Sequence, residues 1–247
     1  MLGKRYRSVD GTIIEAIRDV SFELVQGEVL AILGPTGCGK STLLRLISGV
    51  EAPSEGTIER DKDSTFNIGF IFQDSSLMRW RTVYDNIKLP LEILGRNDPK
   101  KVDELIHTVN LTGFENAYPA ELSGGMRRRA AIARSLVHEP NVLLMDEPLT
   151  GLDEITKEVL QTELSYLIRK MKVTCVLVTH DIGEAVILSD RVLVMSPRPG
   201  TLVDEVRVQL PSVREPAVRS DERFSDYCMF IRKRLNILHP LREREPH

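Results

Sequence analysis

A glycine-rich loop near the N-terminus carries the residue types that bind phosphate. It lies between the apolar segment Glu28–Leu33 and the amphipathic segment Lys40–Ser48. Glycines let the backbone curl so that N–H groups face an anion, and a helix beginning at Lys40 adds its positive N-terminal dipole. The spacing fits the phosphate-loop pattern GxxxxGK[ST] and predicts that ATP is bound by Gly34, Pro35, Thr36, Gly37, Cys38, Gly39, Lys40, Ser41 and Thr42.

Three side chains of this loop have distinct expected tasks. Lys40 can reach the outer phosphates as a point charge, and the hydroxyl of Ser41 is a suitable oxygen ligand for Mg²⁺. Cys38 is interpreted as a small residue that contributes its backbone N–H, rather than as a nucleophile. The loop therefore predicts a site for a nucleoside triphosphate with Mg²⁺.

A second candidate anion site precedes the helix expected at Ser123–His138. Ser123 is a good N-cap, and Gly124 and Gly125 expose backbone N–H groups at the start of that helix. Taken alone, the same residues also fit an ordinary capped helix.

Acidic and basic side chains follow two strands expected to be buried. Asp146 and Glu147 come after the strand Val142–Met145, where a carboxylate can hold Mg²⁺ and a neighbouring one can polarise water. His180 follows the strand Val173–Thr179. Taken alone, an acidic turn and a structural histidine are the competing interpretations.

The elements that must position these residues alternate between apolar and amphipathic segments, which indicates an α/β fold with a mainly parallel sheet. Strands are expected at Glu28–Leu33, Ile68–Phe72, Val142–Met145, Val173–Thr179, Val192–Met195 and Thr201–Val208. Helices are expected at Lys40–Ser48, Val83–Leu94, Lys101–Val109, Ser123–His138, Asp153–Lys172, Ile182–Ser189 and Phe224–Leu238, with a breaker at Gly95–Pro99.

Composition limits the class of protein. The 247 residues are 42% hydrophobic, which is enough for a sizeable core, and the net charge of −3 gives no general reason to expect nucleic-acid binding. The 3 cysteines lack CxxC spacing and fit free thiols in a reducing compartment. We expect no secretory signal and no membrane span, so that any membrane role depends on a partner.

Taken together, these motifs resemble the nucleotide-binding domain of ABC transporters. The match rests on their order along the chain, from about Tyr6 to Met195. The motifs are GPTGCGKST, Gln73, LSGGM (Leu122–Met126), VLLMDEP (Val142–Pro148), GLD (Gly151–Asp153) and His180. The resemblance implies a P-loop fold of the ABC type, with a mainly parallel core, an N-terminal antiparallel β part and a helical lobe that carries the signature.

The resemblance also implies a role for each matching residue. Tyr6 would stack on adenine, Glu147 would be the catalytic carboxylate and His180 the switch histidine. The Mg²⁺ ligands would be Ser41, Gln73 and Asp146. Ser123, Gly124 and Gly125 would be the signature that binds the ATP of a partner subunit, and Asp153 would be the D-loop aspartate.

Some positions depart from the family pattern. Met126 replaces the common glutamine of the signature, and Thr150-Gly151 replace Ser-Ala, but neither change removes a phosphate-binding group. Three further segments are similar to the nitrate, sulfonate and taurine importer group, with Arg79 in place of a proline. They are Phe72–Thr82, Leu188–Val192 and Met195–Gly200.

As the resemblance implies, we expect one ABC ATPase domain over residues 1–247. Residues 1–74 and 140–210 would form the catalytic core, 75–139 a helical lobe, and 211–247 a charged helical tail. ATP on Gly34–Thr42 of one copy would meet Ser123–Gly125 of a second copy in a head-to-tail homodimer. The dimer would drive permease subunits at the cytoplasmic face of the membrane and would depend indirectly on an extracytoplasmic substrate-binding protein.

Trp80 and Met78 are expected to line the groove in which a cytoplasmic helix of the permease docks; burial within the helical lobe is the alternative. A transporter for another solute, a soluble ABC ATPase acting on nucleic acid and a non-hydrolysing regulatory module are the competing functions. The arginine cluster Arg127–Arg129 with Arg134 is interpreted as support for the signature lobe, and Arg232–Arg234 as a solvated helix face.

Overall fold

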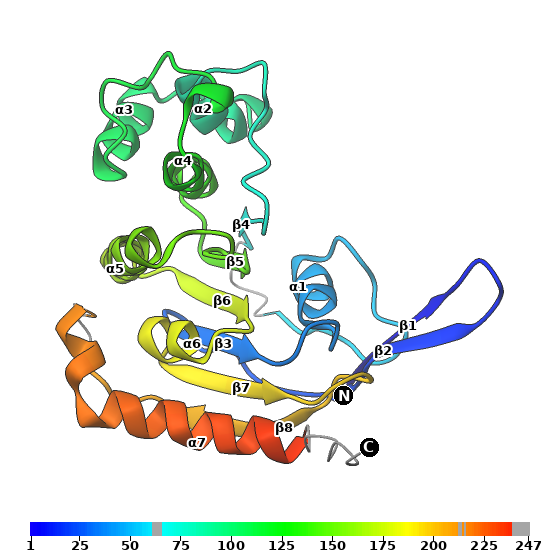
Figure 1. Ribbon diagram of the computed structural model, residues 1–247. Helices are drawn as coiled ribbons and strands as arrows, with labels where there is room; N and C mark the ends of the chain where they lie inside the picture. The colour runs from blue at the N-terminus through cyan, green and yellow to red at the C-terminus, as the bar shows by residue number, and fades with distance from the viewer. Residues whose placement is uncertain (61–65, 212–213, 215, 239–247) are drawn as a thin grey trace, which may run out of the picture. The chain divides into compact units, whose positions relative to one another are not determined.

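The computed structural model describes residues 1–60, 66–211, 214 and 216–238, and these residues form two compact units (Figure 1). Unit 1 contains Met1–Leu24, Glu28–Arg60 and the described residues from Val178 onward. Unit 2 contains Val25–Gly27 and the described residues from Phe66 to Leu177. The last part of the expected charged tail, 239–247, lies outside the described residues.

Unit 1 joins an antiparallel hairpin to a strand group in the order β3-β7-β8. Its strands are β1 (Leu2–Arg7), β2 (Ile13–Val20), β3 (Val29–Leu33), β7 (Arg191–Met195) and β8 (Leu202–Arg207). Its helices are α1 (Lys40–Ser48), α6 (Ile182–Leu188), the 3₁₀ turn η2 (Pro216–Ser220) and α7 (Glu222–Leu238).

The buried centre of unit 1 explains why β3 is a strand. All five residues of β3 are buried, and the strand pairs in parallel with β7, as expected for a continuous apolar run in a covered sheet. The neighbouring β8 pairs with β7 in antiparallel fashion. Helix α6 packs against β3, and α7 packs against α6 (Figure 1). The sheet thus holds the segment after Leu33 at the carboxyl end of a fully buried strand.

Unit 2 contains strands in the order β4-β5-β6 and a group of helices. Its strands are β4 (Ile68–Ile71), β5 (Val142–Asp146) and most of β6 (Thr174–Thr179), which continues into unit 1. Its helices are α2 (Val83–Ile93), α3 (Pro99–Thr108), the 3₁₀ turn η1 (Pro119–Glu121), α4 (Gly124–Leu136) and α5 (Glu154–Met171).

Side-chain caps define where the helices of unit 2 begin. The side chains of Thr82, Asp98, Ser123 and Asp153 each accept a hydrogen bond from the backbone N–H three residues later. Helices α2, α3 and α4 pack together, as Figure 1 shows, and α4 also contacts α5. Strand β4 pairs in parallel with β5, from Ile68 opposite Val142 to Ile71 opposite Met145.

The expected fold class is confirmed, including the N-terminal antiparallel part, which is the β1–β2 hairpin. The expected break between the two helices is confirmed, but the second helix, α3, begins at Pro99 rather than at Lys101, because a proline at the first helical position lacks only an N–H that would be unbonded anyway. The expected division into a core and a helical lobe from 75 to 139 remains a prediction.

No helix among the described residues is both long enough and apolar enough to cross a membrane.

Candidate nucleotide site

The phosphate loop of unit 1 joins β3 to α1. Gly37 and Gly39 have φ angles of 78° and 108°, a region that residues with a side chain rarely adopt. Gly39 is the N-cap of α1 and provides no side-chain hydrogen bond to the first turn. The first N–H groups of α1 therefore have no side-chain cap, which suits them to an anionic ligand.

The ammonium group of Lys40 lies inside the curl of this loop. Only 5% of the residue is exposed, and its Nζ donates to the carbonyl oxygens of Gly34 at 2.8 Å and of Pro35 at 3.1 Å. Cys38 is buried, and burial raises the pKa of its thiol. The thiol is therefore protonated near neutral pH, in agreement with its interpretation as a loop residue rather than a nucleophile.

The turn between β7 and β8 packs against the outer side of the loop. Arg198 donates from Nε to the carbonyl oxygen of Gly37 at 3.2 Å. Gly200 lies so close to the carbonyl of Cys38 that a Cβ atom there would clash with it. Because the carbonyls of Gly37 and Cys38 face this turn, the turn restrains the backbone whose N–H groups are expected to bind phosphate. The sequence resemblance of Met195–Gly200 to an importer group gave no indication of this contact.

Tyr6 is brought to the phosphate loop by the first strand of the hairpin. Its hydroxyl donates to Glu51 Oε2 at 2.6 Å and also bonds to the side chain of Thr42. The ammonium of Lys4 lies 5.1 Å from the ring centroid. Burial, followed by the hydrogen bond to Glu51, raises the pKa of Tyr6, so the ring is neutral. The aromatic residue expected near the nucleotide thus contacts the loop, and its stacking on adenine stays a prediction.

His180 lies in unit 1 directly after β6 and is exposed. The turn that carries it is fixed by Thr179, whose hydroxyl donates to Glu184 at 2.7 Å and accepts from the N–H of Asp181 at 3.0 Å. Asp181 in turn caps α6. A rigid turn therefore presents the histidine at the carboxyl end of a buried strand.

The acidic residues of unit 2 lie at the end of β5. Asp146 is its last residue, and Glu147 follows with a positive φ of 45°. Glu147 Oε2 accepts from the hydroxyl of Thr150 at 3.1 Å and from Nε2 of Gln73 at 3.5 Å. The structure thus brings together Gln73 and Glu147, two residues that lie far apart along the chain. A non-glycine residue with a positive φ is uncommon and is often found at a functional site.

The signature residues form the N-terminus of α4. Ser123 Oγ accepts from the N–H of Met126 at 3.2 Å, which makes Ser123 the N-cap. A Cβ added to Gly125 would lie 2.9 Å from the side chain of Thr156, which marks a close approach of α4 to the start of α5. Asp153 caps α5, and its hydrogen bonds with Thr156 lower the pKa of its carboxyl group. The signature and the expected D-loop residue are therefore neighbours.

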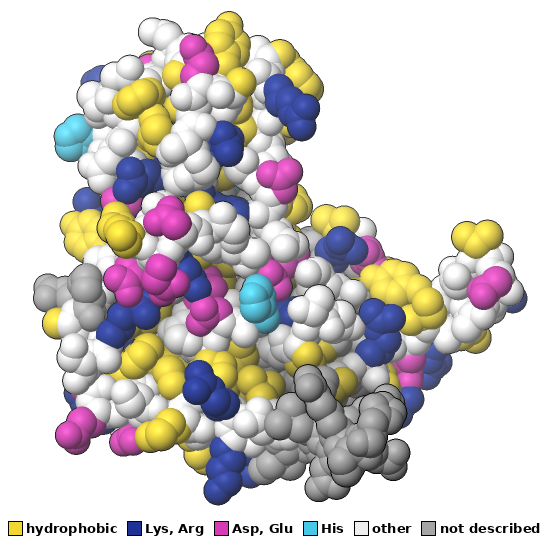
Figure 2. All heavy atoms as spheres, viewed as in Figure 1, with side chains coloured by type: hydrophobic (Ala, Val, Ile, Leu, Met, Phe, Trp, Pro, Cys, Tyr) yellow, Lys and Arg dark blue, Asp and Glu magenta, His cyan; other side chains and the backbone are white. Residues whose placement is uncertain are grey.

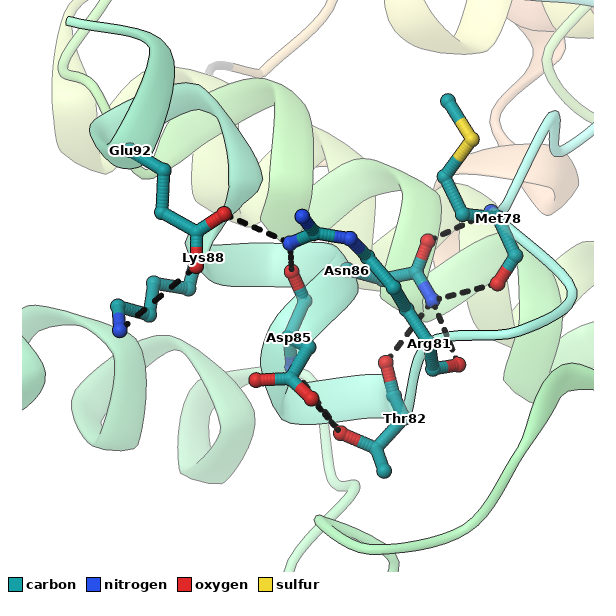
Figure 3. A network of polar contacts seen from close by, with 7 residues as sticks. All are labelled: Met78, Arg81, Thr82, Asp85, Asn86, Lys88 and Glu92. Atoms are coloured by element: carbon teal, nitrogen blue, oxygen red, sulfur yellow. Dashed lines mark hydrogen bonds and ion pairs between the residues drawn. The ribbon is translucent and has the colours of Figure 1, made fainter.

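Trp80 is 74% exposed, so its burial within the helical lobe is excluded. Its turn is held by Asn86, a fully buried residue of α2 that the sequence analysis did not identify (Figure 3). The amide of Asn86 accepts from the N–H of Met78, and its two N–H groups are shared among three carbonyl oxygens of the turn. An asparagine near the start of a helix, just after a loop, is a weak signal for such a role.

The expected residues are thus divided between the two units. Unit 1 holds Tyr6, the loop Gly34–Thr42 and His180, and unit 2 holds Gln73, Ser123–Gly125, Asp146, Glu147 and Asp153. Each group has a defined internal geometry.

Comparison with known proteins identifies the family of the chain. A family model described as ABC transporter matches residues 17–150. In structure, the chain is similar to the ATP-binding cassette MJ0796 in a dimeric post-hydrolysis state bound to ADP and Pi, with a TM-score of 0.73 and 32% sequence identity. The alignment covers 84% of this chain and 97% of that one. The chain therefore belongs to the ABC transporter family, and its recognition from the sequence is confirmed.

Within the family, the chain is similar to ATP-binding subunits named for sulfonate import. It is 40% identical over 235 residues to the aliphatic sulfonates import ATP-binding protein SsuB of Bacillus cereus. The alignment covers 94% of this chain and 91% of that protein. It is 45% identical over 199 residues to SsuB 2 of Pseudomonas syringae, covering 81% and 84%. The resemblance to the sulfonate, nitrate and taurine group is thus confirmed.

Proposed function

We propose that this chain is the ATP-hydrolysing subunit of an importer for small organic sulfonates. The observation that carries the proposal is the glycine-rich loop leading into an uncapped helix N-terminus, with Lys40 enclosed by the loop. The similarity to sulfonate-import subunits over nearly the whole chain supports the substrate class. Taurine is itself a small organic sulfonate, and nitrate is the related alternative.

The residues divide the work of hydrolysis between them. The N–H groups of the loop and Lys40 hold the phosphates, while Glu147 orients the attacking water. His180 stabilises the charge that develops on the transferred phosphoryl group. Tyr6 lies against Thr42 of the loop and is suited to cover the adenine.

Mg²⁺ fits the donors expected for it. The side chains of Ser41, Gln73 and Asp146 offer hydroxyl, amide and carboxylate oxygens, which are the ligands that Mg²⁺ prefers, and none of the three residues is buried. When bound, the ion neutralises part of the phosphate charge.

The signature of unit 2 completes the site in a second copy of the chain. Gly124 and Gly125 follow the N-cap Ser123, and their backbone N–H groups at the start of α4 are suited to the γ-phosphate of a partner's ATP. A structural relative is a dimer, which supports a head-to-tail homodimer here. In this arrangement ATP closes the dimer and hydrolysis opens it.

At the cytoplasmic face of the membrane, the chain binds permease subunits. These subunits connect it to an extracytoplasmic substrate-binding protein, which completes the transporter. Trp80 is suited to the permease contact because it is a large apolar side chain exposed on a firmly held turn. On the face shown in Figure 2, acidic and basic side chains are interspersed, which favours a protein partner over nucleic acid.

The hydrolytic role is tested with Glu147→Gln. We expect ATP turnover to fall by on the order of a hundredfold or more, and ATP to shift the variant to a dimer in gel filtration. Glu104→Gln, on an exposed position of α3, is the matched control and should behave like the wild type. Full hydrolysis by Glu147→Gln would refute this role.

The substrate class is tested by uptake of a labelled alkanesulfonate in cells with and without this chain, with nitrate and taurine as competitors. Uptake that depends on the chain and resists excess nitrate supports the proposal. If nitrate uptake depends on the chain and sulfonate uptake does not, the chain belongs to a nitrate importer instead.

A further inference from the structure

Two arginines of α4 bind the loop that follows β4. Arg128 donates to the carbonyl oxygens of Phe72 at 2.7 Å and of Gln73 at 2.5 Å. Six residues later on the same helix, Arg134 donates to the carbonyls of Ser75 at 3.0 Å and of Ser76 at 2.8 Å. Four carbonyl groups of a five-residue stretch are therefore held by one helix.

Both guanidinium groups are partly or wholly removed from water. Arg128 is only 5% exposed, and Arg134 is half-buried, so that desolvation lowers its pKa. A shielded guanidinium that lost its carbonyl partners would retain the full penalty of desolvation. Arg129 lies between them in sequence but turns away from the loop to form a two-point ion pair with Glu163 of α5.

The same loop continues into the turn that carries Trp80. Asn86 binds the backbone of that turn at Met78, Arg81 and Thr82 (Figure 3). Helix α2, which contains Asn86, packs against α4. A continuous set of hydrogen bonds and packing contacts therefore joins the start of α4 to both Gln73 and Trp80.

We propose that Arg128 and Arg134 are positioning residues that make the loop of Gln73 and Trp80 move with the signature helix as one body. The Gln73 side chain lies 3.5 Å from Glu147, so its distance from the catalytic carboxylate depends on where this loop is held. The anchoring itself is independent of the proposed function, whereas its effect on hydrolysis rests on the roles proposed for Gln73 and Glu147.

The planar fork of arginine is what this arrangement requires. Each guanidinium contacts two separate carbonyls with two different nitrogen atoms, a geometry that a single lysine ammonium does not reproduce. Arg128→Lys and Arg134→Lys therefore retain the charge and most of the packing but lose the two-point contact.

Hydrogen exchange of the full-length protein measures the anchoring directly. In each lysine variant, backbone amides of residues 73–80 should exchange on the order of tenfold faster, the change expected when one charge-assisted hydrogen bond is lost. Amides of β5 should exchange as in the wild type. Arg129→Ala, the matched control on the same helix, should leave the exchange of residues 73–80 unchanged.

Steady-state kinetics provides the second readout. In the lysine variants we expect kcat for ATP to fall several-fold while KM for ATP stays within about twofold, because the phosphate loop belongs to unit 1. Far-UV circular dichroism confirms that the variants are folded, and Trp80 anisotropy reports the added motion of the turn.

Unchanged exchange of residues 73–80 in both lysine variants would overturn the proposal. Faster exchange with an unchanged kcat would also overturn it, because the loop would then not position Gln73 for hydrolysis. An inactive wild-type protein would instead contradict the proposed function, and the exchange measurement would still decide whether the arginines anchor the loop.

Discussion

Asn86 offers a quantitative test of how the Trp80 turn is held. The residue is fully buried, and its amide makes four hydrogen-bond contacts with backbone groups of Met78, Arg81 and Thr82, two of which share one N–H. Asn86→Ala removes all four at once and leaves the backbone groups of the turn without their partner.

The magnitude follows from the number of bonds and the exposure of the turn. The two N–H groups of the amide are shared among three carbonyl oxygens, so the four contacts amount to about three full hydrogen bonds; at about 1 kcal/mol net for each, the total is about 3 kcal/mol. Arg81 and Thr82 are half-exposed, so water can satisfy some of the released carbonyls. We therefore expect Asn86→Ala to lower the free energy of unfolding by about 2 kcal/mol.

Urea unfolding followed by two probes is the assay. Trp80 is the only tryptophan of the chain, so its fluorescence reports on this turn, and circular dichroism reports on the helices. Asn86→Asp keeps the size and the acceptor but replaces both donating N–H groups with an oxygen that repels the backbone carbonyls, and should cost at least as much. Asn236→Ala, on an exposed position of α7, should change stability by less than about 0.5 kcal/mol.

A loss below about 1 kcal/mol in Asn86→Ala, with unchanged Trp80 emission, would refute the reasoning. The turn would then keep its conformation through its own backbone. An Asn86→Asp variant with the same free energy of unfolding as the wild type would likewise show that the shape of residue 86, rather than its donated hydrogen bonds, is what matters.

Two further outcomes are expected. Trp80→Ala should abolish most transport by the assembled importer while the ATPase rate of the isolated chain changes by less than about twofold, and unchanged transport would exclude Trp80 from the permease contact. Because burial raises the pKa of Cys38, its unfolded thiol ionises first, so stability should fall as pH rises above about 8.5. Melting temperatures from pH 7 to 10 should decline less steeply in Cys38→Ala; parallel curves would contradict the assignment.

The sequence was most informative where a function needs a particular residue at a particular spacing. The loop Gly34–Thr42 could be placed between a strand and a helix because glycine, lysine and serine each have a specific task in phosphate binding. The buried runs of β3, β5 and β6 were equally readable, since strands covered on both faces are apolar throughout.

The supporting contacts were not readable in the same way. Arg128, Arg134 and Asn86 act on backbone carbonyls and N–H groups, which every residue has, so no partner residue type marks the contact. The sequence places the arginines together on one helix. Which of them reach the Gln73 loop depends on how that helix is rotated about its own axis against its neighbours. Arg129, with the same side chain, faces Glu163 instead.

The close approach of Gly200 to the carbonyl of Cys38 has a consequence for interpreting natural or laboratory variants. A substitution at Gly200 would push on the phosphate loop from a position late in the chain, outside every motif that identifies a nucleotide site. A genetic screen would therefore score it together with loop mutations such as those of Lys40. Alleles in the β7–β8 turn should be grouped by the loop they displace rather than by their place in the sequence.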